Sequence, residues 1–264
     1  MQDRYVADVG DFGKYGLLRT LCTNLRLAVL WYLVPNETET NDGRHVGYLQ
    51  TDPGGPYGRC DPTLFSALQR IIQGDRSVAS VEASGIFPDT TRFHGVPLRF
   101  ERSELPAVRR KKRSDWFEGA LSVAAGADVA FLDPDNGLQS KVPQHSKKGP
   151  KYAYYADAVA LAELKKSLVI YHHLGRQGTA PEQVRRRAGE LRQHLPRDYQ
   201  VSAVRFRRGS ARVFFVAAAP NHRSELSKRL KAFGFSDWAQ HFATDLPEAA
   251  SETLQTCALG GGTI

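Results

Sequence analysis

The stretch ADVAFLDPDNG near the middle of the chain constrains the fold more than any other. A short apolar run ends abruptly in two acids, a proline, an amide and a glycine, which predicts a buried strand followed by a loop. Ligands of open α/β sheets bind beyond the carboxyl ends of the strands, so Asp133 and Asp135 are expected at the mouth of a cleft. Pro134 ends the strand ladder, and Asn136-Gly137 favours a turn with positive φ that aims the acids instead of burying them. The alternative is a surface turn in which Asp135 and Asn136 only cap a helix.

Other apolar runs that end in polar residues predict further strands, and these alternate with helical patterns. The alternation predicts a Rossmann-like α/β fold with a mostly parallel sheet, helices on both faces and a C-terminal antiparallel hairpin. We expect strands at residues 27–34, 77–82, 97–100, 127–132, 167–176, 199–206 and 211–219, and helices at 61–72, 115–121, 158–164, 181–194 and 223–233.

Length and composition predict one soluble domain. The 264 residues favour a single catalytic domain over 1–246, which begins with a glycine-rich helical segment, and a flexible tail over 247–264. No run approaches the roughly 18 apolar residues of a membrane span, and the first residues lack an apolar signal region. The three cysteines have neither disulfide nor metal-ligand spacing. A cytoplasmic location is therefore expected.

The net charge of +8 points to an acidic partner. Clustered basic side chains commonly contact phosphates, so we expect a polyanion, and nucleic acid in particular. The alternative for each cluster is a solvated basic surface. The clusters are residues 109–113, then Lys147, Lys148 and Lys151, then residues 185–187, then Arg205, Arg207, Arg208 and Arg212.

Glycines recur at every third position near the amino terminus, at 10, 13 and 16, among Asp8, Asp11 and Lys14. Glycine lets a ligand approach the backbone closely, and Lys14 would place a charge at a helix start. The segment is neither a phosphate loop nor a dinucleotide fingerprint, because it lacks the Gly-Lys-Ser/Thr ending and no strand precedes it. The alternative is a glycine-rich helix that docks on the body of the protein.

Two further regions add polar groups to the expected cleft. His172 and His173 end an apolar run, and strand alternation points them to opposite sides, so that one faces the cleft. The lysine-rich residues 139–151 suggest a mobile loop over the cleft. Aromatic rings beside lysines can stack bases while the charges hold phosphates, although the tyrosines can equally pack a helix onto the sheet. The residues expected to bind nucleic acid are Lys148, Lys151, Tyr152 and Arg176.

These motifs resemble those of a known family. Asp133-Pro134 after the fourth strand is similar to the start of the Asp-Pro-Pro-Tyr motif of adenine-N6 methyltransferases. Gly10-Asp11 with Lys14 resembles the Gly-Asn and Lys-His of the large-subunit ribosomal RNA adenine-N6 methyltransferases. Gly209-Ser210 before an apolar strand also has a counterpart there. The resemblance implies methyl transfer from S-adenosylmethionine to a base amine of nucleic acid.

Two departures from that family stand at its most specific motifs. Asp135 and Asn136 replace the second proline and the aromatic residue, and the polar residues 35–42 replace the glycine-rich cofactor loop. Asp133 maps onto the motif acid, whose role in the family is to accept hydrogens from the base amine. The predicted catalytic residues are Asp133, Asp135, Asn136, His172 and Lys14, and the predicted cofactor-binding residues are Asp11, Asn36, Glu37 and Glu82.

Two alternatives use the same sheet differently. Asp133, Asp135, an acid of the first loop and His172 or His173 could bind Mg²⁺ or Mn²⁺, which prefer oxygen ligands. Such a metal would activate water and polarise a phosphoryl oxygen, as in a nuclease or phosphodiesterase. The second alternative is a non-catalytic nucleic-acid-binding module. The sequence leaves the oligomeric state open.

Overall fold

The computed structural model describes residues 1–36, 43–139, 141–209 and 211–245. A seven-stranded sheet has the order β2-β1-β3-β6-β8-β7-β9, and a separate two-stranded sheet pairs β4 with β5. Strands β2, β1, β3, β6 and β7 run in one direction, and β8 and β9 run against them. The strands are β1 Leu27–Leu30, β2 Arg92–His94, β3 Val129–Leu132, β4 Gly137–Leu138, β5 Tyr152–Ala153, β6 Ser167–His173, β7 Gln200–Phe206, β8 Arg212–Ala218 and β9 Phe242–Asp245.

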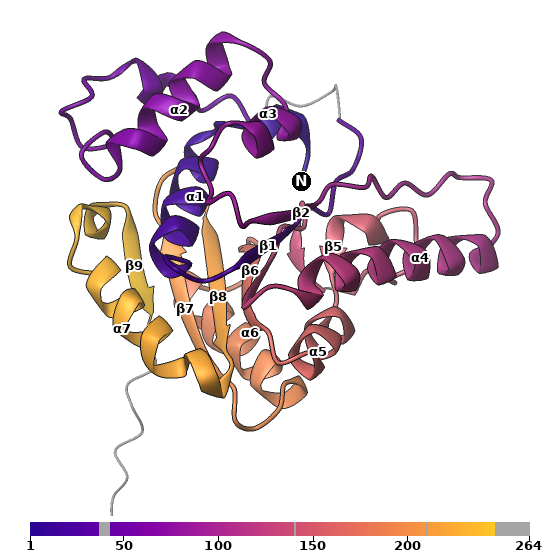
Figure 1. Ribbon diagram of the computed structural model, residues 1–264. Coiled ribbons are helices and arrows are strands. Elements are labelled where there is room, and N and C mark those ends of the chain that lie inside the picture. The colour runs from indigo at the N-terminus through magenta and orange to yellow at the C-terminus, as the bar shows by residue number, and fades with distance from the viewer. Residues whose placement is uncertain (37–42, 140, 210, 246–264) are drawn as a thin grey trace, which may run out of the picture.

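Helices cover both faces of the sheet (Figure 1). On one face lie α1 Val9–Leu21, α2 Pro62–Gln73, α3 Val78–Ala83 and α7 Arg223–Phe233. On the other lie α4 Pro106–Ala125, α5 Tyr155–Glu163 and α6 Ala180–His194. This arrangement confirms the predicted α/β fold with a mostly parallel sheet and a C-terminal hairpin.

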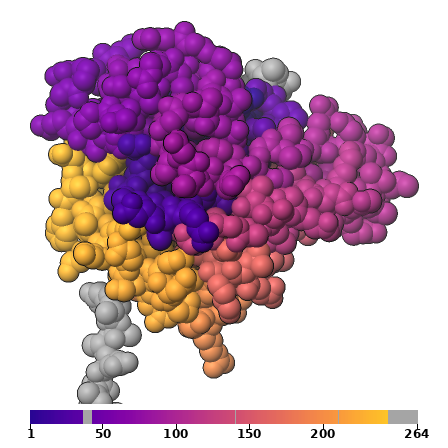
Figure 2. Space-filling model, in the orientation of Figure 1, coloured from indigo at the N-terminus to yellow at the C-terminus, as the bar shows by residue number. Residues whose placement is uncertain are grey.

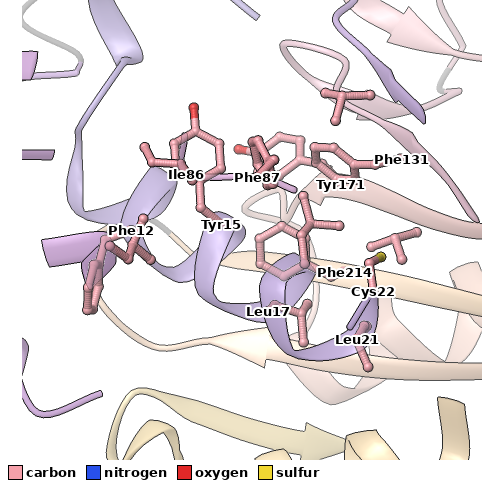
Figure 3. Close-up of a cluster of buried hydrophobic side chains, with 14 of the residues drawn as sticks. Phe12, Tyr15, Leu17, Leu21, Cys22, Ile86, Phe87, Phe131, Tyr171 and Phe214 are labelled. Atoms are coloured by element: carbon pink, nitrogen blue, oxygen red, sulfur yellow. The ribbon is translucent and has the colours of Figure 1, made fainter. Parts of the chain in front are cut away.

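The alternation of side chains along the central strands divides the interior into two layers. Val129 and Phe131 of β3 pack with the α1 layer, whereas Ala130 and Leu132 pack with the α4 layer. Figure 3 shows the apolar side of α1, with Leu17 among its side chains, beside the sheet residues. In the space-filling view the segment that carries α2 and α3 lies over part of the amino-terminal region (Figure 2).

Capping residues set several helix starts where the sequence predicts them. The Asp61 carboxylate accepts a hydrogen bond from the Leu64 amide at 2.9 Å and begins α2. Thr179 begins α6 through a capping box with Glu182. The helix predicted at 223–233 and the hairpin of β7 and β8 are likewise confirmed.

Several predicted boundaries are wrong. Residues 77–82 form helix α3 and not a strand, because the Ser77 hydroxyl accepts from the Ser80 amide and caps a helical turn. Residues 97–100 form no strand; the edge strand is β2, which the sequence did not predict. Strand β1 stops at Leu30, four residues before the predicted end.

The basic run 109–113 lies inside α4, which begins earlier than expected at Pro106. Residues 139–151 are anchored at both ends by the paired strands β4 and β5. The tail predicted over 247–264 lies outside the described residues. Within the part of the chain that the structure describes, no helix combines the length and apolarity needed to cross a bilayer.

Candidate functional site

A pocket of about 310 Å³ lies beyond the carboxyl ends of β3 and β6, beside the amino-terminal end of α1. This is the edge at which α/β sheets bind ligands, and the volume is in the range of small-molecule sites. Residues from distant parts of the chain line it: Met1, Tyr5, Asp8, Gly10, Asp11, Lys14, Gly43, His45, Asp133, Pro134, Asp135, Asn136, Tyr171, His173 and Arg212. The two acids and the glycine-rich segment therefore meet, as the sequence predicts.

A buried ion-pair network holds Asp133 at the pocket. Lys14 Nζ lies 2.8 Å from Asp133 Oδ2 and 2.7 Å from Asp11 Oδ1. The Tyr15 hydroxyl donates to Asp11 Oδ2 at 2.9 Å, so each acid has a fixed partner. All three charged side chains are at least 95% buried. The network is thus a rigid part of the pocket floor.

The pKa values in this network follow from burial and charge. Burial disfavours the charged Lys14 ammonium, but Asp11 and Asp133 outweigh it and raise the pKa of Lys14. Burial raises the pKa of Asp11, although Lys14 opposes the shift. Lys14 therefore stays protonated and acts as a fixed positive charge and hydrogen-bond donor.

Asp135 lies in the same pocket with one oxygen engaged and one without a partner. Oδ2 accepts from Gln2 Nε2 at 3.0 Å and lies 3.1 Å from Lys151 Nζ. Oδ1 is buried and has no hydrogen-bond partner in the described chain. Burial acts to raise the pKa of Asp135, but the Met1 amino group and Lys151 outweigh it, so the pKa is lowered. The side chain is an ionised carboxylate with spare acceptor capacity.

Arg212 supplies the opposite charge. It is the first residue of β8 and pairs in register with His173 of β6. Its Nη2 donates to Asp8 Oδ1 at 3.0 Å. Its guanidinium also lies near the Tyr171 hydroxyl, where burial raises the pKa of the phenol and the positive charge opposes that shift. Its buried Nη1 has no hydrogen-bond partner among the described residues. The sequence placed Arg212 only in a basic cluster; the register of the hairpin with β6, which no local pattern reveals, brings it to the pocket.

The pocket is lined by His173 and not by His172. The His172 side chain is buried, and its Nδ1 accepts from the Leu138 amide at 3.0 Å. Burial lowers the pKa of His172 to about 3. The catalytic role predicted for His172 is therefore not supported by its position, because strand alternation assigns the two imidazoles to opposite faces in the reverse of the predicted order.

The predicted turn at Asn136-Gly137 is confirmed. Gly137 has a φ of +100°, and a Cβ there would meet the Nδ1 and backbone of His172. The turn does not expose the acids, however, since the amino-terminal segment covers them and Asp133 is only 2% exposed. Asn136 also lines the pocket, and its backbone N–H donates to the Lys151 carbonyl at 2.9 Å.

The residues predicted to bind a cofactor do not lie together in the structure. Asp11 lines the pocket, but Glu82 on α3 accepts from the Trp31 indole at 2.8 Å and lies outside the lining. The Asn36 side chain, also outside the lining, accepts from the Arg4 amide. Glu37 lies outside the described residues.

The residues predicted to bind nucleic acid also lie in different environments. Lys151 pairs with Asp135, and Tyr152 begins the short strand β5. Lys148 and Arg176 are exposed. Several clustered cations have internal partners: Arg113 pairs with Asp157, Arg187 with Glu190, Arg207 with backbone carbonyls and Arg212 with Asp8.

The metal-binding alternative was expected to combine Asp133, Asp135 and His172. Over residues 1–36, 43–139, 141–209 and 211–245, no three His, Cys, Asp or Glu side chains are grouped so that they could hold a metal ion. The predicted trio does not assemble, because His172 points away from the two acids.

No protein-family model matches the sequence, and no curated protein matches it significantly.

Proposed function

We propose that the protein transfers a methyl group from S-adenosylmethionine to an amine of a nucleic-acid base. The sheet contains the antiparallel hairpin of β7 and β8 that the resemblance to methyltransferases implies. A pocket lies at the carboxyl edge of its parallel strands, and Asp133 stands there at the end of β3. These features support the proposal together.

The observation that carries the proposal is a pair of unsatisfied groups of opposite charge. Asp135 Oδ1 and Arg212 Nη1 are both buried, both belong to pocket-lining residues and both lack a hydrogen-bond partner in the described chain. Leaving such a group unpaired costs about 1–3 kcal/mol, so buried polar atoms normally have partners. An α-amino acid group, with its ammonium and its carboxylate, would satisfy both.

The charge of the lining suits the cofactor as well. Four acids line the pocket, Asp8, Asp11, Asp133 and Asp135, against three cationic groups, Lys14, Arg212 and the Met1 amino group. The excess of one acid favours a ligand with an additional positive centre. S-adenosylmethionine combines an amino-acid end with a sulfonium cation, and it supplies an electrophilic methyl group when bound. Asp135 would hold its ammonium and Arg212 its carboxylate.

Asp133 would act on the substrate. Its carboxylate would accept an N–H from the base amine and so orient the nitrogen lone pair. Lys14 keeps one carboxylate oxygen fixed at 2.8 Å, which limits the rotation of the acid. Asp133 is thus assigned to substrate orientation and Lys14 to positioning Asp133.

Calorimetry with S-adenosylmethionine tests the cofactor assignment. Asp135→Asn and Arg212→Gln each remove one charge-assisted hydrogen bond, worth about 1.5–3 kcal/mol, and should weaken binding about 10- to 100-fold. Adenosine, which lacks the amino-acid end, should be insensitive to both changes. Asp128→Asn is a matched control, because Asp128 precedes the same strand at its opposite end and pairs with Arg26.

Binding of Mn²⁺ without S-adenosylmethionine would contradict the proposal and favour metal-dependent cleavage. If neither ligand binds and Asp133→Ala leaves nucleic-acid affinity intact, the chain is a binding module. Where the cofactor does bind, Asp133→Asn should retain it but lose transfer of a radiolabelled methyl group to nucleic acid.

A further inference from the structure

The segment 142–149 lies against the beginning of α4. Arg109 Nη1 donates to the His145 carbonyl at 3.3 Å, which joins the helix to the segment. The Tyr154 hydroxyl donates to the Val142 carbonyl at 3.1 Å and holds the start of the segment. We call this contact region, formed by residues 109–113 and 142–149, the α4 seam.

Polar groups along the α4 seam lack partners. Arg109 Nε, Arg113 Nε and Nη1, His145 Nδ1 and Ser146 Oγ are buried, and none has a hydrogen-bond partner in the described chain. Arg113 is only 3% exposed; its Nη2 binds Asp157 at 2.5 Å, and its guanidinium lies 4.8 Å from the Trp116 ring centroid. Native proteins rarely leave so many buried groups unpaired in one region.

The α4 seam is rich in positive charge, since residues 109–113 and 142–149 contain seven Lys or Arg residues and no acid. Burial lowers the pKa of His145, and Arg110 and Arg113 lower it further, which places both guanidinium groups near the imidazole. Arg110, Lys147 and Lys148 are exposed around the seam. Two nearby acids are paired, Glu104 with Lys112 and Asp115 with Lys111. Donors that lack acceptors beside exposed cations match the chemistry of a phosphate group.

The seam is connected to the pocket. The Asn136 backbone N–H donates to the Lys151 carbonyl at 2.9 Å. Both ends of the segment between these two residues therefore lie at the pocket. At the return point Lys151 lies 3.1 Å from Asp135 in the pocket. Figure 1 shows α4 on the side of the molecule opposite to α7.

We propose that the α4 seam binds phosphate groups of a nucleic-acid strand and so brings a base of that strand to the pocket. The delivery of a base rests on the proposed function, whereas the phosphate contact does not. Phosphate contacts fix the register of a strand on a protein without reading its sequence, which is the task required beside a pocket that accepts one base.

The test compares two charge-matched double variants by fluorescence anisotropy with a labelled single-stranded oligonucleotide. Lys147→Gln with Lys148→Gln removes two cations at the seam, and Lys228→Gln with Lys231→Gln removes two exposed cations from α7. We expect the seam variant to bind about tenfold more weakly or worse. Its plot of log affinity against log salt should be less steep by about 1.4, for two lost contacts at about 0.7 each.

The α7 variant should keep the wild-type affinity and salt slope. Equal losses in both variants would reduce the effect to net charge and overturn the proposal, as would a seam variant that binds normally. Inorganic phosphate, compared with chloride at equal ionic strength, separates the two sources of phosphate. An oligonucleotide that binds no more tightly than inorganic phosphate would make the seam a small-anion site and refute the nucleic-acid assignment.

Calorimetry with S-adenosylmethionine keeps this inference separate from the proposed function. The seam variant should bind the cofactor as the wild type does, because its substitutions lie outside the pocket lining. Loss of oligonucleotide binding in the seam variant, in a protein that never binds the cofactor, would support the seam while ending the methyltransferase proposal.

Discussion

At the scale of single residues, Lys14 connects more of the charged groups in the pocket than its neighbours do. It is the shared partner of Asp11 and Asp133, and its ammonium also lies 5.8 Å from the Tyr171 ring centroid. A buried pair contributes little net stability relative to apolar residues, but removing one partner leaves an uncompensated charge. Lys14 therefore lines the pocket and is also expected to stabilise the fold.

Lys14→Met should destabilise the protein by about 3–5 kcal/mol, because two buried carboxylates lose their cation. Urea unfolding followed by circular dichroism measures the loss. Lys111→Met is the control, since Lys111 pairs with Asp115 on the exposed surface of α4 and its loss should change the stability far less. Similar losses in the two variants would show that the network is not buried as described.

His172 gives a prediction about pH. Burial and neighbouring positive charge lower the pKa of His172 from 6.5 to about 3. The imidazole therefore stays neutral in the folded chain, whereas in the unfolded chain it takes up a proton below pH 6.5. The unfolded state then binds more protons, and stability falls as the pH drops from 6.5 towards 3.

His172→Asn, which keeps an acceptor for the Leu138 amide but cannot titrate, should lack this loss. From pH 7.5 to pH 5 the wild type should lose about 2 kcal/mol more than the variant, at about 1.4 kcal/mol for each pH unit below 6.5. Urea midpoints at the two pH values provide the comparison. Equal losses of stability in the two proteins would show that a group other than His172 titrates in this range.

At the scale of elements, α1 explains the glycines at every third position. A Cβ at Gly13 would meet the Phe206 ring of β7, and one at Gly16 would meet the Trp238 ring. Gly10 lines the pocket beside Arg212. The docking interpretation is therefore confirmed at Gly13 and Gly16, whereas the approach of a ligand to the backbone at Gly10 stays a prediction.

Gly16→Ala should destabilise the protein by about 1–2 kcal/mol, because the clash with Trp238 exceeds the gain in helix propensity. Gly189→Ala in α6 is the matched control, since a Cβ there meets no atom within 4 Å. That variant should be more stable by about 0.5–1 kcal/mol. Thermal or urea unfolding should give opposite signs, and two stabilised variants would contradict the close packing of α1.

At the scale of the whole molecule, the sheet joins two apolar layers that share few side chains. Trp31 and Trp238 belong to the α1 layer, and Trp116 belongs to the α4 layer. Every residue of β3 contributes to one layer or the other, so neither layer can keep its packing when the sheet is lost. We therefore expect the sheet and both layers to unfold as one cooperative unit.

Tryptophan fluorescence tests this cooperativity. The variant Trp31→Phe with Trp238→Phe reports the α4 layer, and Trp31→Phe with Trp116→Phe reports the α1 layer. In each variant, the urea midpoint by fluorescence should coincide with that by circular dichroism. A fluorescence transition that precedes the loss of secondary structure in one variant would show that its layer unfolds independently.

The sequence by itself determined the elements whose signals are local. Apolar runs that end in turn residues located β3 and β6, and Asp61-Pro62 located the start of α2. It also identified Asp133, Asp135 and Lys14 as unusual. Residues 77–82 misled because so short a segment, with its two valines three residues apart, fits a helical turn as well as a strand.

Only the tertiary structure decided which side chains share the pocket. The choice of His173 over His172 depends on the phase of one strand, where a shift of one residue exchanges the faces. The arrival of Arg212 depends on the register of β8 against β6, and the unpaired atoms of Arg212 and Asp135 depend on where every neighbouring donor and acceptor lies. These are contacts between residues far apart in the chain, and no periodicity within a single segment encodes them.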